Sequence, residues 1–517
     1  MNASLDPTTI LGIITAYFAV LILISYLTNR GGGDNESFFL AGRQSPWPLV
    51  AIGMIGASLS GVTFISVPGA VGAGGANQAF SYMQVVFGYL LGYLFIAVVL
   101  LPLYYRMGLT SIYEYLQQRI GRHAYKIGAF YFLLSRTIGA AFRLFLVAVV
   151  LQAFVTGPLG VPYAATVAIT IVLIWLYTFQ GGIKTIVYTD TLQTVCMLLA
   201  AGLTIFYIGQ ALETDLGGMV SLIRNSDYSQ LFYFERGWSD PNNFFKQFFS
   251  GALITIVMTG LDQDMMQKNL SMPNFRDAQK NMAVFSVVLV FANLLFLALG
   301  ALLYIYATSV GLDIPASSDQ LYPSIALNHL PAAAGVVFIL GLIAAAYSSA
   351  DSALTALTTS FCVDFLGMGE RAGEATDEES ATERRRVDRR KRLYVHLGFS
   401  VLLFVVILAF RAIGNQAVVT SLFKAAGYTY GPLLGLFAFG LLTRLKVRET
   451  VTLGGVTVPV LLLVCLLAPV VSIVVDANSA DWLGGFQFGF LILAFNGLLT
   501  FLGLLALSDF TDLDGEE

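Results

Sequence analysis

Long apolar segments recur along almost the whole chain, and no other feature constrains the fold as much. Crossing the hydrocarbon core of a bilayer takes about 20 largely apolar residues. Windows of that length identify about thirteen candidate spans, near residues 8–29, 47–73, 79–105, 124–156, 161–180, 183–211, 244–268, 277–309, 332–365, 392–411, 416–443, 449–475 and 484–508. Hydrophobic residues make up 57% of the sequence and charged residues 12%, which excludes an ordinary soluble globular protein. We therefore predict an all-α integral membrane protein.

Several classes of catalytic or metal site are missing from the sequence. No phosphate-binding G-x-x-x-x-G-K-[ST] motif occurs, so ATP-driven pumping by this chain is not expected. The three cysteines lie in apolar runs and the three histidines are scattered, which gives neither a disulfide framework nor a zinc site. We expect a membrane protein that is not an enzyme, has no nucleic-acid partner and functions as a monomer.

Basic residues alternate between the loops on the two sides of the predicted spans. One set of loops carries most of them: Arg30, Arg43, Arg106, Arg119, Arg122, Lys184, Lys268, Arg276, Lys280, Arg384 to Arg392, Arg444, Lys446 and Arg448. The other set carries few, chiefly Arg224, Arg236 and Arg411. Because positive loops stay in the cytoplasm, we predict an outside N-terminus and a cytoplasmic C-terminus in the cell inner (plasma) membrane.

The segment AAAYSSADSALTALTTSFCVDFL (344–366) places polar groups inside an apolar span. Its hydroxyl residues share one helical face: Ser348, Ser352, Thr355 and Thr359. Asp351 sits beside that face, and a carboxylate in hydrocarbon usually faces a partner, an ion or a water-filled cavity. Hydroxyl and carboxylate oxygens are also the ligands that hard cations accept. The segment therefore predicts a protein that handles a cation.

Two predicted spans are poor continuous helices. Glycine, serine and Pro68 interrupt the span at 47–73, and the span at 244–268 breaks in ALITIVMTGLDQDMMQK. They begin two blocks of five spans, and such matching interruptions point to a transporter site, although close helix packing explains small residues equally well. Carbonyls freed near Gly56 and Leu59 would meet the hydroxyls of Ser348 and Ser349, forming an oxygen cage suited to Na⁺.

Five motifs, read together, resemble one family. They are SFFLAGR (37–43), LSGVTFISVPG (59–69), LTSIYEYL (109–116), GGIKTIVYTDTLQ (181–193) and SSADSALTALTTSFCVDF (348–365). All look like the sodium:solute symporter family, whose members carry sugars, proline, iodide, monocarboxylates or sialic acid. The resemblance covers essentially the whole chain. It implies a LeuT-type five-plus-five inverted repeat with about thirteen transmembrane helices in a lipid bilayer.

The expected repeat divides the chain. An N-terminal extra helix and loop (1–46) precede the first repeat (47–211). An extracellular loop (212–243) leads to the second repeat (244–443), which contains a charged, solvated cytoplasmic linker (367–392). Two C-terminal helices and a short acidic tail (444–517) follow.

The resemblance also implies sodium ligands. The family's main Na⁺ site maps onto the carbonyls of Gly56, Leu59 and Ala345 and the hydroxyls of Ser348 and Ser349. A second Na⁺ found in some members maps onto Asp190, Ser348, Asp351 and Ser352, giving one or two ions in total. Members more often have serine or threonine where Asp351 stands. Two carboxylates there would repel, so Asp351 either helps bind a second Na⁺, carries a proton or bonds a neighbouring helix.

Substrate contacts follow from the sialic acid transporters of the family. Matching positions are Ser58, Ser60, Thr63, Gln84 and Arg143, with Lys424 placed where sugar-type members contact substrate. A guanidinium in hydrocarbon needs an anionic partner and fits a carboxylate bidentately. Arg143 could alternatively pair with Asp262 or Asp264, proline-type members carry a similar arginine, and Lys424 could instead extend to the membrane interface.

The resulting prediction is Na⁺-coupled import of a small organic solute by alternating access, with an anion such as sialic acid or another carboxylate as substrate. The alternatives are a Na⁺/sugar or Na⁺/proline symporter, proton-linked transport through Asp351, a passive cation channel and a membrane sensor. A sensor would need an attached signalling domain, and we expect none after the last span.

Overall fold

A computed structural model describes residues 7–28, 35–179, 182–235, 237–368, 378–413, 418–453 and 456–509. The middle of the charged linker (369–377), the acidic tail (510–517) and Arg30 and Arg236 of the orientation argument lie outside the described residues.

The described residues up to Ala211 form helices and the turns between them. Its α-helices are α1 (Pro7–Thr28), α2 (Asn35–Leu40), α3 (Trp47–Ala73), α4 (Tyr82–Phe95), α5 (Leu101–Arg106), α6 (Glu114–Arg119), α7 (Arg122–Leu151), α8 (Tyr163–Thr178) and α9 (Gly182–Ala211). A 3₁₀ turn covers Ala41–Arg43, and π-helical turns cover Ile96–Leu100 and Gln152–Thr156. The first π turn joins α4 to α5, so that Tyr82–Arg106 forms one span.

The rest of the chain adds further helices and two small strand pairs. The helices are α10 (Leu216–Arg224), α11 (Phe244–Thr255), α12 (Gln263–Leu270), α13 (Phe275–Ser309), α14 (Leu321–Asn328), α15 (Ala332–Ser360), α16 (Glu378–Ile413), α17 (Val418–Thr429), α18 (Gly431–Leu442), α19 (Val460–Ala477), α20 (Ser479–Trp482) and α21 (Ile492–Ala506). π turns cover Ile256–Gly260 and Phe361–Phe365, and 3₁₀ turns cover Asp227–Ser229, Gly237–Ser239, Ser318–Gln320 and Gly489–Leu491. Strand β1 (Lys446–Val447) pairs antiparallel with β4 (Ser508–Asp509), and β2 (Val451–Leu453) with β3 (Val456–Val458).

The all-α membrane prediction is confirmed in its coarse form. Ten helices of the described residues are long and apolar enough to cross a membrane, or eleven if the bent pair α11–α12 is one span. Each predicted window contains a helix, but α8 and α18 are shorter apolar helices of fewer than 18 residues. The exact count of thirteen spans therefore stays a prediction.

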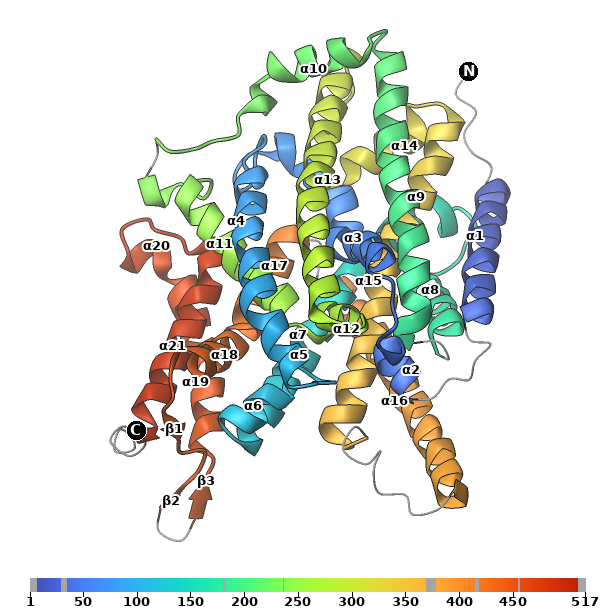
Figure 1. Cartoon of the computed structure of the whole chain (residues 1–517). Coiled ribbons are helices and arrows are strands. Elements are labelled where there is room, and N and C mark those ends of the chain that lie inside the picture. Colours follow the sequence, from blue (N-terminus) through green and yellow to red (C-terminus); the bar gives the residue numbers. More distant parts are fainter. Residues whose placement is uncertain are drawn as a thin grey trace.

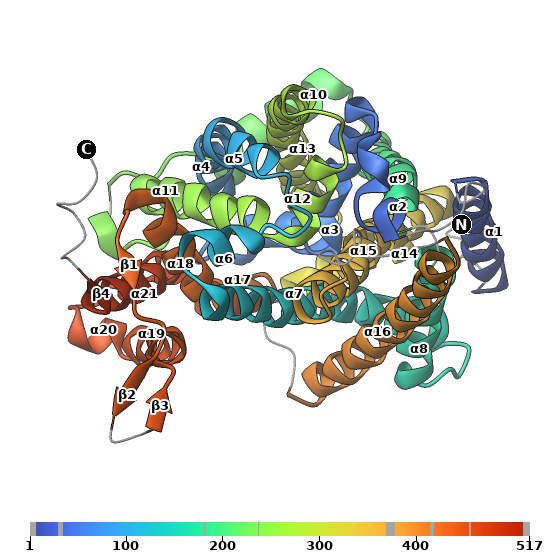
Figure 2. The same cartoon turned by 60° about the horizontal axis from the view of Figure 1, so that its bottom comes forward.

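Burial separates a central group of helices from a peripheral one. In α3 and α15, 89% and 72% of the most apolar window is buried inside the protein, whereas the value is 28% in α1 and 22% in α19. Figure 1 shows α3 and α15 in the middle, with α1 at one edge and α19 and α21 at the other. Figure 2 shows the same two flanks from below. Polar residues on α3 and α15 are thereby shielded from lipid.

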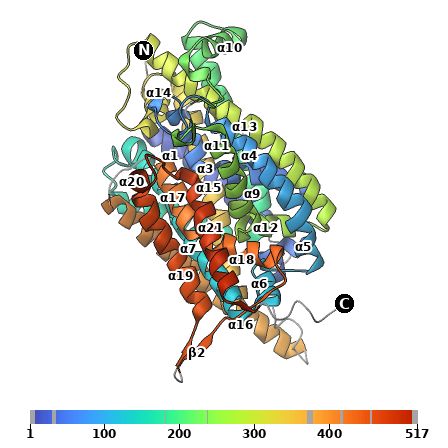
Figure 3. The same ribbon diagram turned by 90° about the vertical axis from the view of Figure 1, so that its left-hand side faces the viewer.

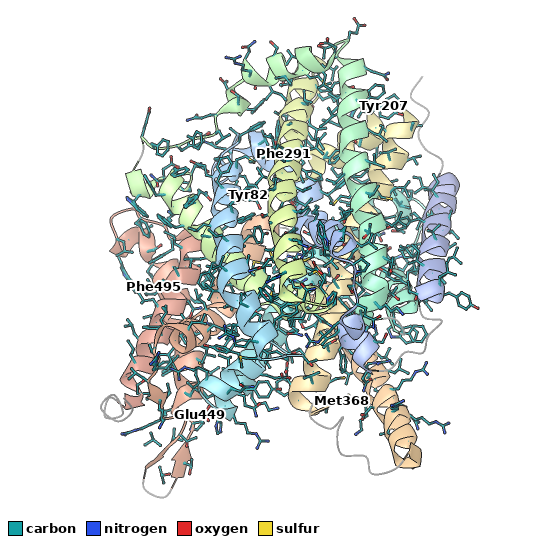
Figure 4. The ribbon with its side chains drawn as sticks, viewed as in Figure 1. Tyr82, Tyr207, Phe291, Met368, Glu449 and Phe495 are labelled. Atoms are coloured by element: carbon teal, nitrogen blue, oxygen red, sulfur yellow. The ribbon has the colours of Figure 1, made fainter. Side chains whose placement is uncertain are left out.

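The peripheral helices turn apolar side chains outward. Leu23 on α1 is 54% exposed, and Leu94 on α4 is 58% exposed. Such side chains suit contact with acyl chains. The β2–β3 hairpin projects from the opposite end of the molecule to α10 (Figure 3). Figure 4 shows side chains filling the space between the helices, with Tyr82 beside the upper part of α4.

One sequence expectation is refined and another is wrong. The basic run of the predicted linker is the first part of α16, and its described side chains are mostly exposed, as a solvated segment requires. Lys268 is not a loop residue: it lies in α12 and is 1% exposed. Its charge is buried and paired with a carboxylate, so it says nothing about loop orientation.

Candidate functional site

Helix α3 is broken in its middle. Ser60 has φ 53° and ψ 173°, so the backbone leaves the helical conformation there. A residue in this conformation interrupts the ladder of i to i−4 hydrogen bonds, which frees carbonyls in the preceding turn. Gly56 and Leu59 lie in that turn, and both are buried. The break predicted from glycine and serine content is therefore present, at Ser60.

The hydroxyls of α15 face this break. Ser349 donates to the carbonyls of Ala57 (3.4 Å) and Ala345 (3.5 Å), which connects α15 to the broken turn of α3. Ser348 Oγ is fully buried and has no hydrogen bond of normal geometry among the described residues. A buried hydroxyl without a partner is costly, so this oxygen is available to a ligand.

A glycine permits this close approach. A Cβ at position 56 would lie 2.2 Å from Thr194 Oγ1 of α9 and 3.2 Å from Ser348 Oγ of α15. The Gly56 amide donates to the same threonine oxygen at 3.0 Å. Gly56 thus allows α3, α9 and α15 to meet around the two serines. The arrangement brings together Gly56, Ala345, Ser348 and Ser349, with Leu59 in the same broken turn.

The second interrupted span is α11–α12. The two helices are bent by 62° around the break at residues 261–262. Asp262 caps α12, because its carboxylate accepts from the Asp264 amide at 2.9 Å. Both predicted interruptions are therefore real bends of the backbone.

A cavity lies beside the break in α3. Its empty space, part of it open to solvent, is about 780 Å³. Polar side chains from six helical segments line it: Ser58, Ser60 and Thr63; Tyr82, Tyr89 and Tyr93; Arg136 and Arg143; Thr255; Thr259; and Asn293. Tyr93 lines the cavity wall together with Ser58, Thr255 and Thr259.

Two arginines of α7 reach the cavity, and they have different partners. Arg136 forms ion pairs with both carboxylates at the break, with Asp264 in close contact and Asp262 at 3.8 Å. Tyr430, between α17 and α18, also donates to Asp262 at 2.5 Å. The alternative in which Arg143 takes these carboxylates is therefore wrong, because Arg136 holds them.

Arg143 has no ion pair among the described residues. It is 7% exposed, and its Nε and Nη1 atoms have no hydrogen-bond partner in the described part of the chain. An unpaired guanidinium at this depth is costly. The side chain is therefore suited to an anion that enters the cavity.

A cluster of charged side chains, formed by Lys268, Asp190 and Asp351, lies next to the α15 hydroxyls. Lys268 Nζ is 2.7 Å from Asp190 Oδ2, and Ser352 Oγ donates to the same oxygen at 3.1 Å. Asp351 accepts from Tyr177 OH at 2.9 Å and from the Ser352 amide at 2.6 Å. The four residues proposed for a second ion thus lie together, with a lysine already beside them.

Gln84 and Lys424 lie outside the cavity lining. Gln84 is fully buried, donates to the carbonyls of Asn242 (2.8 Å) and Ser81 (3.3 Å), and accepts from the Tyr233 amide (3.1 Å). These bonds fix the loops at the top of α4. The Lys424 side chain is 53% exposed and lies 3.7 Å from Asp476.

Sequence reasoning missed the roles of Arg136 and Lys268. Arg136 lies two helical turns before Arg143, on the same face of α7, and that spacing was a usable signal. The sequence offered no such signal for Lys268, because its partner Asp190 lies 78 positions away on another helix.

Comparisons with known proteins agree on one family. The family model of the sodium:solute symporter family matches residues 38–447. The chain belongs to the sodium:solute symporter family. It is therefore a sodium-coupled, multi-pass membrane transporter of a small solute and not an enzyme.

Curated relatives of this symporter have modest identity over most of their length. The sodium/sialic acid symporter NanT of Aliivibrio fischeri is 24% identical over 85% of this chain and 84% of its own. The sodium/sialic acid symporter SiaT of Proteus mirabilis is 20% identical, with 84% coverage of both. The human sodium/iodide cotransporter is 24% identical over 82% of this chain and 65% of its own.

Solved structures support the fold. A Na⁺-coupled sialic acid symporter in a substrate-bound outward-open state has a TM-score of 0.77, with 16% identity and coverage of 96% of this chain and 97% of its own. Mhp1, a nucleobase-cation-symport-1 family transporter, has a TM-score of 0.53 at 15% identity, covering 92% and 94%. At these identities the likeness is one of fold, and it is the LeuT-type fold that the motifs implied.

Proposed function

We propose that this symporter imports a small organic carboxylate together with Na⁺. The observation that carries the proposal is the buried, unpaired guanidinium of Arg143 in the wall of the cavity. A carboxylate accepts two parallel hydrogen bonds from such a group. A neutral sugar would leave the charge uncompensated, so the cavity favours an anion over a sugar.

The remaining lining favours a solute that also carries hydroxyl groups. Ser58, Ser60 and Thr63 from the broken helix, together with Asn293, offer neutral donors and acceptors around the cavity. Three tyrosines from α4 provide both ring surface and hydroxyls. An acidic sugar of the sialic acid class combines a carboxylate with several hydroxyls, and two of the relatives are sialic acid symporters. We take this class as the substrate.

The coupling Na⁺ binds at the break of α3. Its ligands are the carbonyls of Gly56, Leu59 and Ala345 and the hydroxyls of Ser348 and Ser349, all oxygen donors of the kind that hard cations accept. The buried Ser348 hydroxyl, which lacks a hydrogen bond of normal geometry, supports this assignment. Na⁺ at this position would hold α3 and α15 together and so favour one state of the cycle over the other.

The proposal includes the finer features of the architecture. The chain has thirteen spans arranged as two inverted five-span repeats, an outside N-terminus and a cytoplasmic C-terminus in the inner membrane, and works as a monomer. Inward Na⁺ movement then follows the membrane potential, which supplies about 2.3 kcal/mol per charge per 100 mV.

Ligand-induced thermal stabilisation of the purified protein tests the substrate class. N-acetylneuraminate, lactate, galactose and proline are each added with Na⁺ or with K⁺. We expect N-acetylneuraminate to raise the melting temperature in Na⁺ only, because a state-specific ligand stabilises by mass action. Arg143→Ala should remove this response, while Lys424→Ala, which changes an exposed cation outside the cavity, should keep it. A response to galactose or proline alone would contradict an anionic substrate.

A further inference from the structure

A buried lysine lies where a second Na⁺ would bind. Lys268 Nζ is 2.7 Å from Asp190 Oδ2, and the two side chains are 2% and 0% exposed. Asp190 is one of the residues that the family resemblance assigns to a second ion, and Ser352, another of them, donates to the same carboxylate oxygen. The ammonium therefore holds one of the two Asp190 oxygens that a second sodium ion could use.

The charges around α15 can be counted. Asp190 and Asp351 are fully buried, and Lys268 lies within electrostatic reach of both. With both carboxylates ionised, two carboxylates and one ammonium leave a net charge of −1 in a region shielded from solvent. Burying an unbalanced charge is costly, so one further positive charge, either a Na⁺ or a proton on Asp351, balances the cluster, and a second Na⁺ would be in excess.

The main sodium site lies next to this cluster. Ser348 Oγ faces the Asp190 carboxylate without a hydrogen bond of normal geometry, and Asp190 Oδ1 is also buried and without a partner among the described residues. Gly53 of α3 packs against Asp190, since a Cβ there would lie 3.0 Å from Asp190 Cβ. One Na⁺ between α3 and α15 would therefore supply the missing positive charge.

We propose that the Lys268 ammonium permanently replaces a second sodium ion, so that Asp190 and Asp351 are balanced by one lysine and one Na⁺. The protein then binds a single Na⁺ in each transport cycle. This inference rests on the proposed function, because it takes the main Na⁺ site as given. Lys268 is a positioning and stoichiometry-determining residue, since it acts on ion number without contacting the solute cavity.

Equilibrium binding of ²²Na⁺ to the purified full-length protein tests the inference without knowledge of the solute. We expect about one Na⁺ per wild-type chain. In Lys268→Met the Asp190 carboxylate loses its ammonium partner, and with Ser348 and Ser352 it should take a second Na⁺, which raises the count to about two. Asp190→Asn/Lys268→Met removes one charge of each sign and should bind about one.

The outcomes separate the two proposals. Two Na⁺ per wild-type chain would overturn the role of Lys268 while leaving the main site intact. No Na⁺ bound to a folded wild-type chain would instead overturn the main site. One Na⁺ bound to a folded Lys268→Met chain would show that Lys268 stabilises the position of Asp190 but does not replace a second Na⁺. If Lys268→Met fails to fold, the wild-type count alone decides the stoichiometry, and a count of two still overturns the inference.

Discussion

Arg136 and Arg143 lie on the same face of α7, and both line the cavity, yet their surroundings differ. Arg136 is held by Asp262 and Asp264 at the break between α11 and α12, whereas Arg143 has no ion pair in the described part of the chain. Both residues are buried arginines, so the difference between them is the ion-pair partner. The comparison indicates that Arg136 stabilises the bent span, and the lack of an ion pair at Arg143 supports its proposed role in binding an anionic solute.

Replacing each arginine by methionine should give the largest difference in stability between the two sites. Arg136→Met leaves two buried carboxylates without their cation and should destabilise the protein by about 3–5 kcal/mol. Arg143→Met removes a charge that has no partner, so stability should change by less than about 1 kcal/mol or increase. Thermal unfolding in detergent measures both. Equal losses of stability would contradict the comparison.

The Arg136 pair can be tested by a double-mutant cycle. Asp264→Asn in the Arg136→Met background removes the carboxylate that the first change leaves unpaired. We expect the double variant to recover about 1–3 kcal/mol relative to Arg136→Met, the range found for coupled neighbours. Additive losses would mean that the ion pair contributes nothing beyond its separate groups.

The same contrast applies to buried hydroxyls. Ser348 has no hydrogen bond of normal geometry, whereas Ser472 on α19 donates to the Ala468 carbonyl at 2.7 Å. Losing a contact to a charged group costs about 1.5 kcal/mol, so Ser348→Ala should raise the Na⁺ concentration for half-maximal uptake roughly tenfold. Ser472→Ala is the control and should leave it unchanged. An unaltered Na⁺ dependence in Ser348→Ala would remove Ser348 from the ligand set.

Lys424 should show the smallest effect. Its contact with Asp476 is 3.7 Å long and largely exposed, and such pairs contribute about 0–1 kcal/mol. We expect Lys424→Ala to keep both stability and solute uptake within twofold of wild type. Loss of uptake with normal folding would restore Lys424 as a substrate contact.

Features set by local sequence could be predicted well. Apolar length predicted the positions of the helices, and glycine and polar residues within two apolar spans predicted the breaks in α3 and α11–α12. The shared face of Ser348, Ser352, Thr355 and Thr359 followed from helical spacing, and all four are buried. Each of these depends on residues close together in the chain.

Features set by partners from distant helices could not be predicted. The sequence places Lys268 among the loop cations, but in the structure its partner is Asp190, which is far away in the sequence. Gln84 looked like a substrate contact, but its amide is used by the loops around Asn242 and Tyr233. The bend at Asp262 determines which of the two arginines is left without an ion pair. This bend depends on how the helices pack, which the sequence does not show.

Uptake into proteoliposomes under separate ion gradients tests the central claim most directly. Labelled N-acetylneuraminate is offered to wild type and to Arg143→Ala under an inward Na⁺ gradient, an inward H⁺ gradient or neither. The account predicts accumulation by wild type under the Na⁺ gradient alone and none by Arg143→Ala. Accumulation driven by H⁺ alone, or equal uptake by the two proteins, would contradict Na⁺-coupled transport of a carboxylate held by Arg143.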